Sequence, residues 1–342
     1  MQTHQAVVLG GTGFIGRGLV RALLASGQPV RVVSRSARAG SETEPGLTFA
    51  SGDVGNAEDM RKAVAGATVV YHLATGGGET WADFERDFLQ GLRNIAGACL
   101  DNGVQRLVYT SSIAGLYLGG GGTVDERTGP DSQPEKRGNY ARAKIEAERI
   151  LVELQASRKL PAVILRPGLV VGRGGILTHS GVGFWASDTW ALGWGGGENP
   201  LPFVLAEDVV SAMVLAGSAP GVDGTAFNLV GDQRPTAREF VRELSRRSHR
   251  RFHFYPQSMI KMQGIEIFKW LMKVAAKKPG NTFPSYRDLK SRSLATQFDC
   301  SAAKTKLGWR PAADSEHFWA EAIDAHIKAV PPGDLRLAAA RA

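Results

Sequence analysis

The stretch NYARAK places a tyrosine and a lysine where they could transfer a proton. On a helix, residues four apart lie on the same face and one turn apart, so Tyr140 and Lys144 would be neighbours. An ammonium group beside a phenol favours the phenolate, and we therefore expect a lowered pKa for Tyr140. Such a phenol could act as a general acid or base near neutral pH.

A second tyrosine–lysine pair has the same spacing, so spacing alone does not identify the reactive pair. Tyr286 and Lys290 lie in the stretch YRDLK. Tyr140 is favoured because it begins an uninterrupted helical pattern, and because the stretch YTSS, which ends at Ser112, closes an earlier predicted strand. The carboxyl ends of parallel strands form ligand crevices, so Ser112 and Tyr140 could meet there. Tyr286 follows Pro284 and is expected to serve packing or to lie at the surface.

Three glycines near the start of the chain, in the stretch VVLGGTGFIG, indicate a phosphate-binding turn. The apolar run at 6–9 predicts a strand, and the apolar spacing at 19–24 predicts the helix that follows. Gly10 could make the tight turn, Gly13 could let the backbone approach a pyrophosphate, and Gly16 could let the helix lie close to the strand. This context favours a dinucleotide site over a simple tight connection between a strand and a helix.

The tip of the next strand indicates which dinucleotide is bound. The strand at 30–33 is followed by Ser34 and Arg35, with Arg38 just beyond. A carboxylate there would accept hydrogen bonds from the ribose 2′-hydroxyl of NAD, whereas guanidinium groups suit the 2′-phosphate of NADP. The sequence therefore favours NADP(H) over NAD(H), with a solvated basic loop as the alternative.

Strand and helix patterns alternate along the first 120 residues, which predicts an α/β fold with a doubly wound parallel sheet. The expected elements include a strand at 67–75, helices at 84–102 and from Asn139, and a strand at 161–172. We expect the following division: a cofactor-binding domain at 1–172 with part of 203–230, a substrate-binding cap at 173–202 and 231–330, and a flexible tail at 331–342.

Composition and charge disfavour several other classes of protein. The chain has 342 residues, a formal net charge of +8, seven histidines and two cysteines. The two cysteines predict no disulfide framework, and histidines without close ligand spacing predict no metal site. The basic residues are scattered, so an anionic cofactor explains the charge better than nucleic acid does. We see no bilayer-spanning stretch and no leader, and therefore expect a cytoplasmic protein.

Motifs spread along the whole chain carry a family resemblance. They occur in the order GGTGFIG, HLAT, VYTSS, YARAK, LRPG, FVLAEDVVSAMVLA and DCSAAKTKLGWRP. With this set, the chain resembles the extended short-chain dehydrogenase/reductase family of the NAD-dependent epimerase/dehydratase type. Within that family it is most similar to the 3β-hydroxysteroid dehydrogenase-like and dihydroflavonol reductase-like branch. The resemblance implies an NAD(P)-dependent oxidoreductase with a Rossmann domain and a smaller, mostly helical C-terminal substrate-binding cap.

The resemblance also implies a role for individual residues. Ser112 would hydrogen-bond the substrate carbonyl, Tyr140 would transfer the proton, and Lys144 would hold the nicotinamide ribose. Arg35 would contact the 2′-phosphate. The implied cofactor site comprises Gly10, Thr12, Gly13, Phe14, Ile15, Gly16, Arg35, Asp53, Val54, Leu73, Ala74, Thr75, Tyr140, Lys144, Pro167 and Gly168.

This catalytic set predicts hydride transfer between NADP(H) and a ketone or secondary alcohol. A nucleotide-sugar epimerase or dehydratase on the same scaffold is the alternative. A cofactor-sensing protein without catalytic activity is disfavoured, because it would be expected to have lost the tyrosine or the lysine. The resemblance further implies a homodimer, formed by the helices at 84–102 and 139–155.

The substrate is expected to be lipophilic or polycyclic. The segment 195–209 contains no arginine or lysine to hold a diphosphate, although Arg173 on a neighbouring loop could do so. The expected substrate contacts are Ser112, Phe184, Trp185 and Trp190, with Trp194 as a further apolar wall. The apolar and basic segment 259–278 could form a lid over such a substrate, or could graze a membrane.

Overall fold

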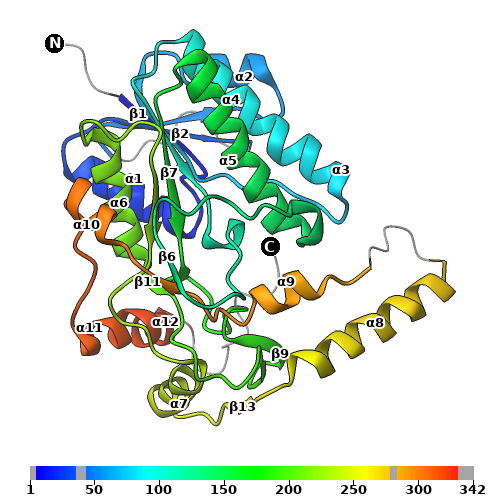
Figure 1. The fold of residues 1–342 in the computed structure, drawn as a ribbon. Coiled ribbons are helices and arrows are strands. Elements are labelled where there is room, and N and C mark those ends of the chain that lie inside the picture. Colours follow the sequence, from blue (N-terminus) through cyan, green and yellow to red (C-terminus); the bar gives the residue numbers. More distant parts are fainter. Residues whose placement is uncertain (1–4, 36–43, 278–282, 330–342) are drawn as a thin grey trace.

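A computed structural model describes residues 5–35, 44–277 and 283–329 (Figure 1). Arg38 and the tail at 331–342, for which the sequence predicts a cofactor contact and flexibility, lie outside the described residues. Within the described part, seven parallel strands form a central sheet in the order β12-β7-β5-β4-β1-β2-β3. This sheet, with helices on both faces, confirms the predicted doubly wound α/β fold.

The central strands are β1 Gln5–Leu9, β2 Val30–Ser34, β3 Leu47–Ser51, β4 Ala67–His72, β5 Arg106–Thr110, β7 Ala162–Pro167 and β12 Ala226–Leu229. Smaller sheets are formed by β6 Thr123–Val124 with β14 Gln297–Phe298, by β8 Leu169–Val171 with β11 Phe203–Leu205, and by β9 Gly183–Ser187, β10 Trp190–Gly193 and β13 His253–Tyr255. The helices are α1 Phe14–Ala25, α2 Ala57–Ala63, α3 Trp81–Phe84, α4 Gln90–Asp101, α5 Asn139–Arg158, α6 Ala206–Ser218, α7 Ala237–Ser248, α8 Met259–Ala275, α9 Tyr286–Ser291, α10 Ser301–Lys306, α11 Ser315–Trp319 and α12 Ala325–Ala329.

Alternation along β1 explains why the sheet is covered on both faces. Ala6 and Val8 belong to one core cluster together with residues of α1 and α6. Val7 and Leu9 belong to a second cluster with residues of α2, α4 and α5. Successive strand residues point to opposite faces, so an apolar run without alternation requires a helix layer on each side.

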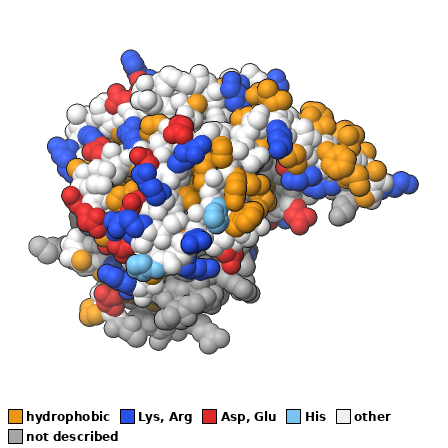
Figure 2. Space-filling view, turned by 90° about the horizontal axis from the view of Figure 1, so that it is seen from below, with side chains coloured by type: hydrophobic (Ala, Val, Ile, Leu, Met, Phe, Trp, Pro, Cys, Tyr) orange, Lys and Arg blue, Asp and Glu red, His pale blue; other side chains and the backbone are white. Residues whose placement is uncertain are grey.

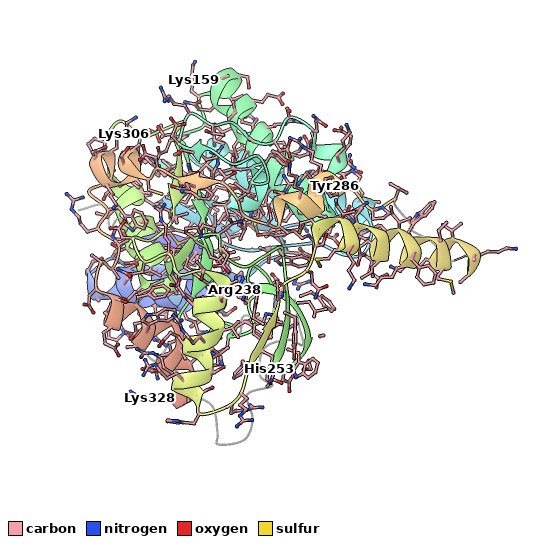
Figure 3. All side chains as sticks on the ribbon, turned by 60° about the horizontal axis from the view of Figure 1, so that its bottom comes forward. Lys159, Arg238, His253, Tyr286, Lys306 and Lys328 are labelled. Carbon is pink, nitrogen blue, oxygen red and sulfur yellow. The ribbon has the colours of Figure 1, made fainter. Side chains whose placement is uncertain are left out.

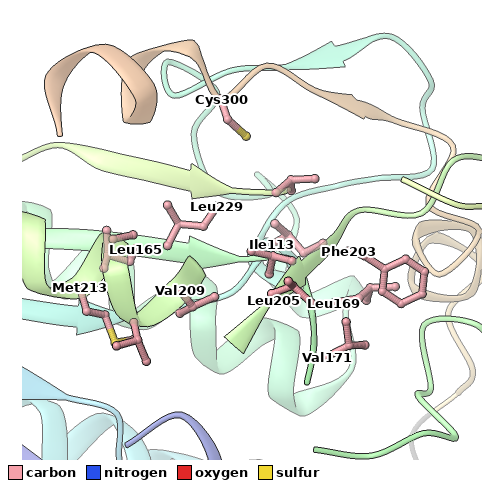
Figure 4. Packing of buried hydrophobic residues seen from close by; sticks show 14 of the residues in the cluster. Ile113, Leu165, Leu169, Val171, Phe203, Leu205, Val209, Met213, Leu229 and Cys300 are labelled. Carbon is pink, nitrogen blue, oxygen red and sulfur yellow. The ribbon is translucent and has the colours of Figure 1, made fainter. Parts of the chain in front are cut away.

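The predicted strand at 161–172 is divided in two at Gly168. β7 belongs to the central sheet, whereas β8 leaves it and pairs with β11. A side chain at Gly168 would overlap the carbonyl oxygen of Pro202, so only glycine lets the two segments approach this closely. The apolar side chains of Leu169, Val171, Phe203 and Leu205 extend the core beyond the sheet at this point (Figure 4).

Two segments of the C-terminal half differ from expectation. The region around Trp185, predicted to contact the substrate, forms an antiparallel hairpin of β9 and β10, to which β13 adds in parallel. Helix α8, predicted to be a lid, runs outward from the body of the protein and contains no buried residue (Figure 1). Among the described residues, no helix combines the length and apolar character needed to cross a bilayer.

Candidate active site

A cavity of about 910 Å³ lies at the carboxyl ends of the central strands. Its walls include the turn after β1, Leu73 and Thr75 after β4, the segment 110–112 at the end of β5, and Pro167 with Gly168 at the end of β7. The opposite wall comes from 174–181, Trp194 and the α9 region. Strands 1, 4, 5 and 7 therefore deliver their ends to one site, as expected for a parallel sheet.

The glycine turn fits a dinucleotide pyrophosphate. Gly10 has φ +87°, a conformation that other residues rarely adopt. A side chain at Gly16 would overlap the Gly10 carbonyl oxygen, so glycine lets α1 lie against the turn. Helix α1 begins after Gly13 with no side-chain cap and no acidic residue in its first turn. Its first N–H groups are therefore left to bind an anion.

The remaining predicted cofactor residues divide into two groups. Phe14, Ile15, Leu73, Thr75, Pro167 and Gly168 line the cavity. Thr12, Arg35, Asp53, Val54 and Ala74 are not among its lining residues.

Residues of the second group occupy places beside the glycine turn and at the sheet edge. A side chain at Gly10 would contact the backbone of Ala74 at 2.8 Å, so the HLAT motif packs directly on the glycine turn. Asp53 accepts a hydrogen bond from the Gly55 N–H at 2.9 Å, and Arg35 follows β2 as an exposed side chain. The cofactor roles of these residues stay predictions.

The structure brings Ser112, Tyr140 and Lys144 together on the cavity wall. Tyr140 lies in the first turn of α5, and its phenol is hydrogen-bonded with the Ser112 hydroxyl. The Lys144 ammonium, one turn further along, lies 5.8 Å from the centre of the Tyr140 ring. The alternative pair, Tyr286 and Lys290, does not line the cavity.

The electrostatics of this group differ from expectation. Partial desolvation at the cavity wall raises the pKa of Tyr140, which is 47% exposed, and the hydrogen bond with Ser112 opposes that rise. The predicted lowering of this pKa by Lys144 is therefore wrong for the structure described here. Lys144 donates instead to the Thr110 carbonyl oxygen at 2.8 Å. Burial lowers the pKa of Lys144 to about 7, although Glu148 acts to raise it.

A buried ion pair that sequence reasoning missed supports helix α5. Glu148, one turn beyond Lys144, forms a bidentate pair with Arg166 of β7, the shortest N–O distance being 2.6 Å. Glu148 also accepts a hydrogen bond of 2.5 Å from the Ser111 hydroxyl. This network joins α5 to the ends of β5 and β7 beside Ser112. The sequence signal that could have drawn attention to Glu148 was its spacing of four from Lys144.

A second network, also missed, holds the start of α5. Arg137 pairs with Asp131 at 2.8 Å and with Asp288 of α9 at 3.3 Å. Asp288 also accepts from the Gly138 N–H at 2.9 Å and pairs with Arg292 at 3.0 Å. Arg137, Asp288 and Arg292 all line the cavity. Because α9 and α5 lie far apart in the sequence, no local pattern could reveal this contact.

Of the four aromatic residues predicted to surround the substrate, one forms part of the cavity wall. Trp194 lines the cavity, donates to the Ser180 carbonyl oxygen at 2.6 Å and stacks with the Arg292 guanidinium. Phe184, Trp185 and Trp190 do not line it. Trp185 packs edge-on against Phe252, and the other two are about half exposed on the outside of the hairpin.

Comparison with known proteins identifies a matching family, proteins of similar sequence and structures of similar fold. The model of the NAD dependent epimerase/dehydratase family matches residues 6–229. A 3-beta-hydroxysteroid dehydrogenase of Mycolicibacterium neoaurum is 32% identical over 182 residues. That match covers 50% of this chain and 48% of the relative, and so about half of each protein.

Two further comparisons cover nearly the whole chain. A UDP-glucose 4-epimerase of Vibrio cholerae is 26% identical over 336 residues, which cover 94% of this chain and 95% of the relative. The crystal structure of gox2253 superimposes with a TM-score of 0.77 and 24% identity over 94% of this chain and 97% of that one. The structural match supports the fold alone.

Proposed function

Because this chain belongs to the NAD-dependent epimerase/dehydratase family, and is thus an enzyme that uses a nicotinamide dinucleotide, we propose that it interconverts a ketone and a secondary alcohol on a lipophilic small molecule. The bound nicotinamide supplies or accepts the hydride. The observation that carries the proposal is that Ser112, Tyr140 and Lys144 line the same cavity as the glycine turn.

Each of the three residues has a distinct task in this proposal. In the reducing direction the Tyr140 hydroxyl gives its proton to the substrate oxygen, and the Ser112 hydroxyl donates a hydrogen bond to the same oxygen. The raised pKa of Tyr140 suits a phenol that stays protonated until the substrate oxygen becomes negative. Lys144 holds the nicotinamide ribose, and its ammonium is held in place by the Thr110 carbonyl oxygen at 2.8 Å.

The cavity wall supports an uncharged substrate. Its apolar side chains are Ile113, Leu118, Leu169, Val170, Ile176, Trp194 and Leu294. The lining arginines already have carboxylate partners, since Arg137 pairs with Asp131 and Arg292 pairs with Asp288. Arg173 is not a lining residue. A diphosphate here would compete with these carboxylates for its cationic partners. The name of the mycobacterial relative, a hydroxysteroid dehydrogenase, fits this substrate class.

Nucleotide-sugar epimerisation is the second candidate. Arg292 is half exposed, with 52% of its side chain accessible, and stacks with Trp194 at the cavity wall. An aromatic ring and an arginine together could hold a nucleoside diphosphate. The epimerase of Vibrio cholerae matches nearly the whole chain.

A competition experiment separates the two candidates. Steroid and other polycyclic ketones and UDP-sugars are titrated against the enzyme loaded with NADPH, and oxidation of NADPH is followed by absorbance. We expect turnover of at least one ketone and weak binding of UDP-sugars. Micromolar binding of a UDP-sugar without turnover of any ketone in the panel would favour the epimerase function instead.

The cofactor form is tested separately through Arg35. We propose NADP(H), because β2 ends at Ser34 and Arg35 without a carboxylate. Titration should show binding of NADPH several-fold tighter than that of NADH, and Arg35→Ala should remove most of the difference. Equal affinity for the two cofactors in the unmodified enzyme would contradict the assignment.

A further inference from the structure

Helix α8 carries apolar side chains on both of its faces. Its half-buried side chains recur at helical spacing and are Met259, Met262, Gln263, Glu266, Ile267 and Trp270. This face lies against the segment leading into α9. Gln263 donates to the Pro284 carbonyl oxygen at 2.7 Å, and Trp270 packs edge-on against Phe283. Two of the six side chains that face the protein are thus polar, where apolar ones are expected.

The opposite face of α8 is apolar and exposed. The exposed fractions are 77% for Ile260, 44% for Ile265, 63% for Phe268, 51% for Leu271 and 58% for Met272. These residues form one stripe along the helix, because at about 100° per residue all five fall within one sector of roughly 140°. Figure 2 shows the stripe as hydrophobic side chains on the part of the molecule that projects from the body. A contiguous apolar surface of this kind marks a binding site.

Exposed aromatic residues of the neighbouring hairpin continue this surface. Trp190 of β10 lies 5.2 Å from the ring of Tyr255 in β13, and the two side chains are 49% and 37% exposed. Phe184 of β9 is 52% exposed, and the Lys269 ammonium of α8 lies 5.9 Å from its ring. Tryptophan and tyrosine are favoured where apolar and polar media meet.

The charge of α8 identifies the occupant. Residues 259–277 contain four lysines and one acidic residue, Glu266, which pairs with Lys269 at 2.8 Å. A second copy of this helix would bring lysines near lysines, whereas an anionic surface would complement them. We propose that α8 docks on the surface of an anionic lipid bilayer, together with the aromatic residues Phe184, Trp190 and Tyr255 of the neighbouring small sheet. The apolar stripe would lie at the boundary between headgroups and acyl chains.

This lipid-binding surface is joined to the cavity through α9 and also through the hairpin, whose flanking residues Gly181 and Trp194 line the cavity. α8 packs on α9, and Asp288 and Ser291 of α9 line the cavity wall. Figure 3 shows Tyr286, the first residue of α9, beside the near end of α8. Docking would therefore hold the cavity close to the bilayer, where lipophilic molecules concentrate. The docking itself does not depend on the proposed chemistry.

Vesicle flotation tests the proposal on the full chain. The probes are vesicles of phosphatidylcholine alone and vesicles in which roughly a third of the lipid is phosphatidylglycerol. We expect the protein to float with the anionic vesicles, to float weakly with the neutral ones, and to be released as salt is raised. The double variant Phe268→Glu, Leu271→Glu should lower the partition coefficient roughly ten-fold or more, because it places charge in the apolar stripe.

A matched pair of charge reversals separates a local from a general electrostatic effect. Lys273→Glu reverses a charge on α8. Lys306→Glu changes the net charge by the same amount, but it lies on α10, on the side of the molecule away from α8 (Figure 3). Only Lys273→Glu should weaken binding. Unchanged cofactor binding by the Phe268→Glu, Leu271→Glu variant would show that it is folded.

Three results would overturn the proposal. The first is that the protein does not float with anionic vesicles at low salt. The second is that Lys273→Glu and Lys306→Glu weaken vesicle binding equally. The third is that the protein binds no vesicles and that sedimentation shows an oligomer which the α8 variants dissociate.

Discussion

The phenolic hydroxyl of Tyr140 can be removed without changing the shape of the cavity. Tyr140→Phe should lower kcat by roughly 10²–10⁴-fold, because the proton donor is lost, while the dissociation constant of the cofactor changes little. Steady-state kinetics and cofactor titration measure the two effects. Tyr286→Phe is the matched control, since Tyr286 has the same spacing to a lysine but does not line the cavity. Retained activity in Tyr140→Phe with loss in Tyr286→Phe would show that the wrong pair has been chosen.

Lys144 gives a prediction about pH. Burial lowers its pKa to about 7, whereas an unfolded lysine titrates near 10.4. Between these values the unfolded state binds more protons, so Lys144 should make the free energy of unfolding of the cofactor-free protein rise as pH increases from about 7 to about 10. Lys144→Met removes this contribution. Denaturant titration of both proteins across that range is the measurement, and equal slopes in the two would contradict the prediction.

The sequence locates the residues that the structure brings together at the cavity, but it does not give their energetics. Tyr140, Lys144 and Ser112 are found because helical spacing and strand ends are local features. The direction of the pKa shift of Tyr140 depends on how the folded cavity encloses the phenol, and spacing carries no information on that. Trp194 was predicted as an apolar wall, whereas Asp288 reaches the site from a distant segment and so was not predicted as a site residue.

At the scale of elements, the glycine turn makes a sharp prediction. Gly16→Ala should abolish cofactor binding, because the added methyl group would overlap the Gly10 carbonyl oxygen and displace α1 from the turn. Gly264→Ala is the matched control, since the same change in α8 meets no atom within 4 Å. That control should stabilise α8 by up to about 1 kcal/mol. Cofactor titration and thermal unfolding check both variants, and normal binding by Gly16→Ala would exclude this role for the turn.

Element type was more predictable than element partnership. Apolar runs and helical periodicity locate β1, β2, β4, β5 and β7 and the helices α1, α4 and α5, whereas the hairpin of β9 and β10 was not predicted. The side of α8 that faces the protein was not predictable, because Gln263 and Glu266 lie on the half-buried face while Phe268 lies outside. The break at Gly168 depends on the approach of Pro202, which belongs to another segment. Such choices are made by tertiary contacts, which local patterns do not contain.

At the scale of the whole molecule, the alternation of strands and helices predicts the parallel sheet, because parallel strands require crossovers and the crossovers cover both faces. Strand β12 pairs with β7 and completes the sheet. In the chain, β12 is separated from the earlier strands of this sheet by β11, which belongs to a different sheet, and by α6. Helix α8 lies outside this core, because none of its residues is buried.

A homodimer through the helices at 84–102 and 139–155 is the last prediction. On α5, Val152 is 55% exposed, whereas the apolar residues of α4 are largely buried within one chain. We expect a dimer at micromolar concentration by sedimentation velocity, weakened by Val152→Glu, because a charge at an apolar contact is costly to desolvate. Phe268→Glu should leave the dimer intact, because α8 is assigned to a lipid surface. A monomer in the unmodified protein would contradict the prediction, and dissociation by Phe268→Glu alone would move the interface to α8.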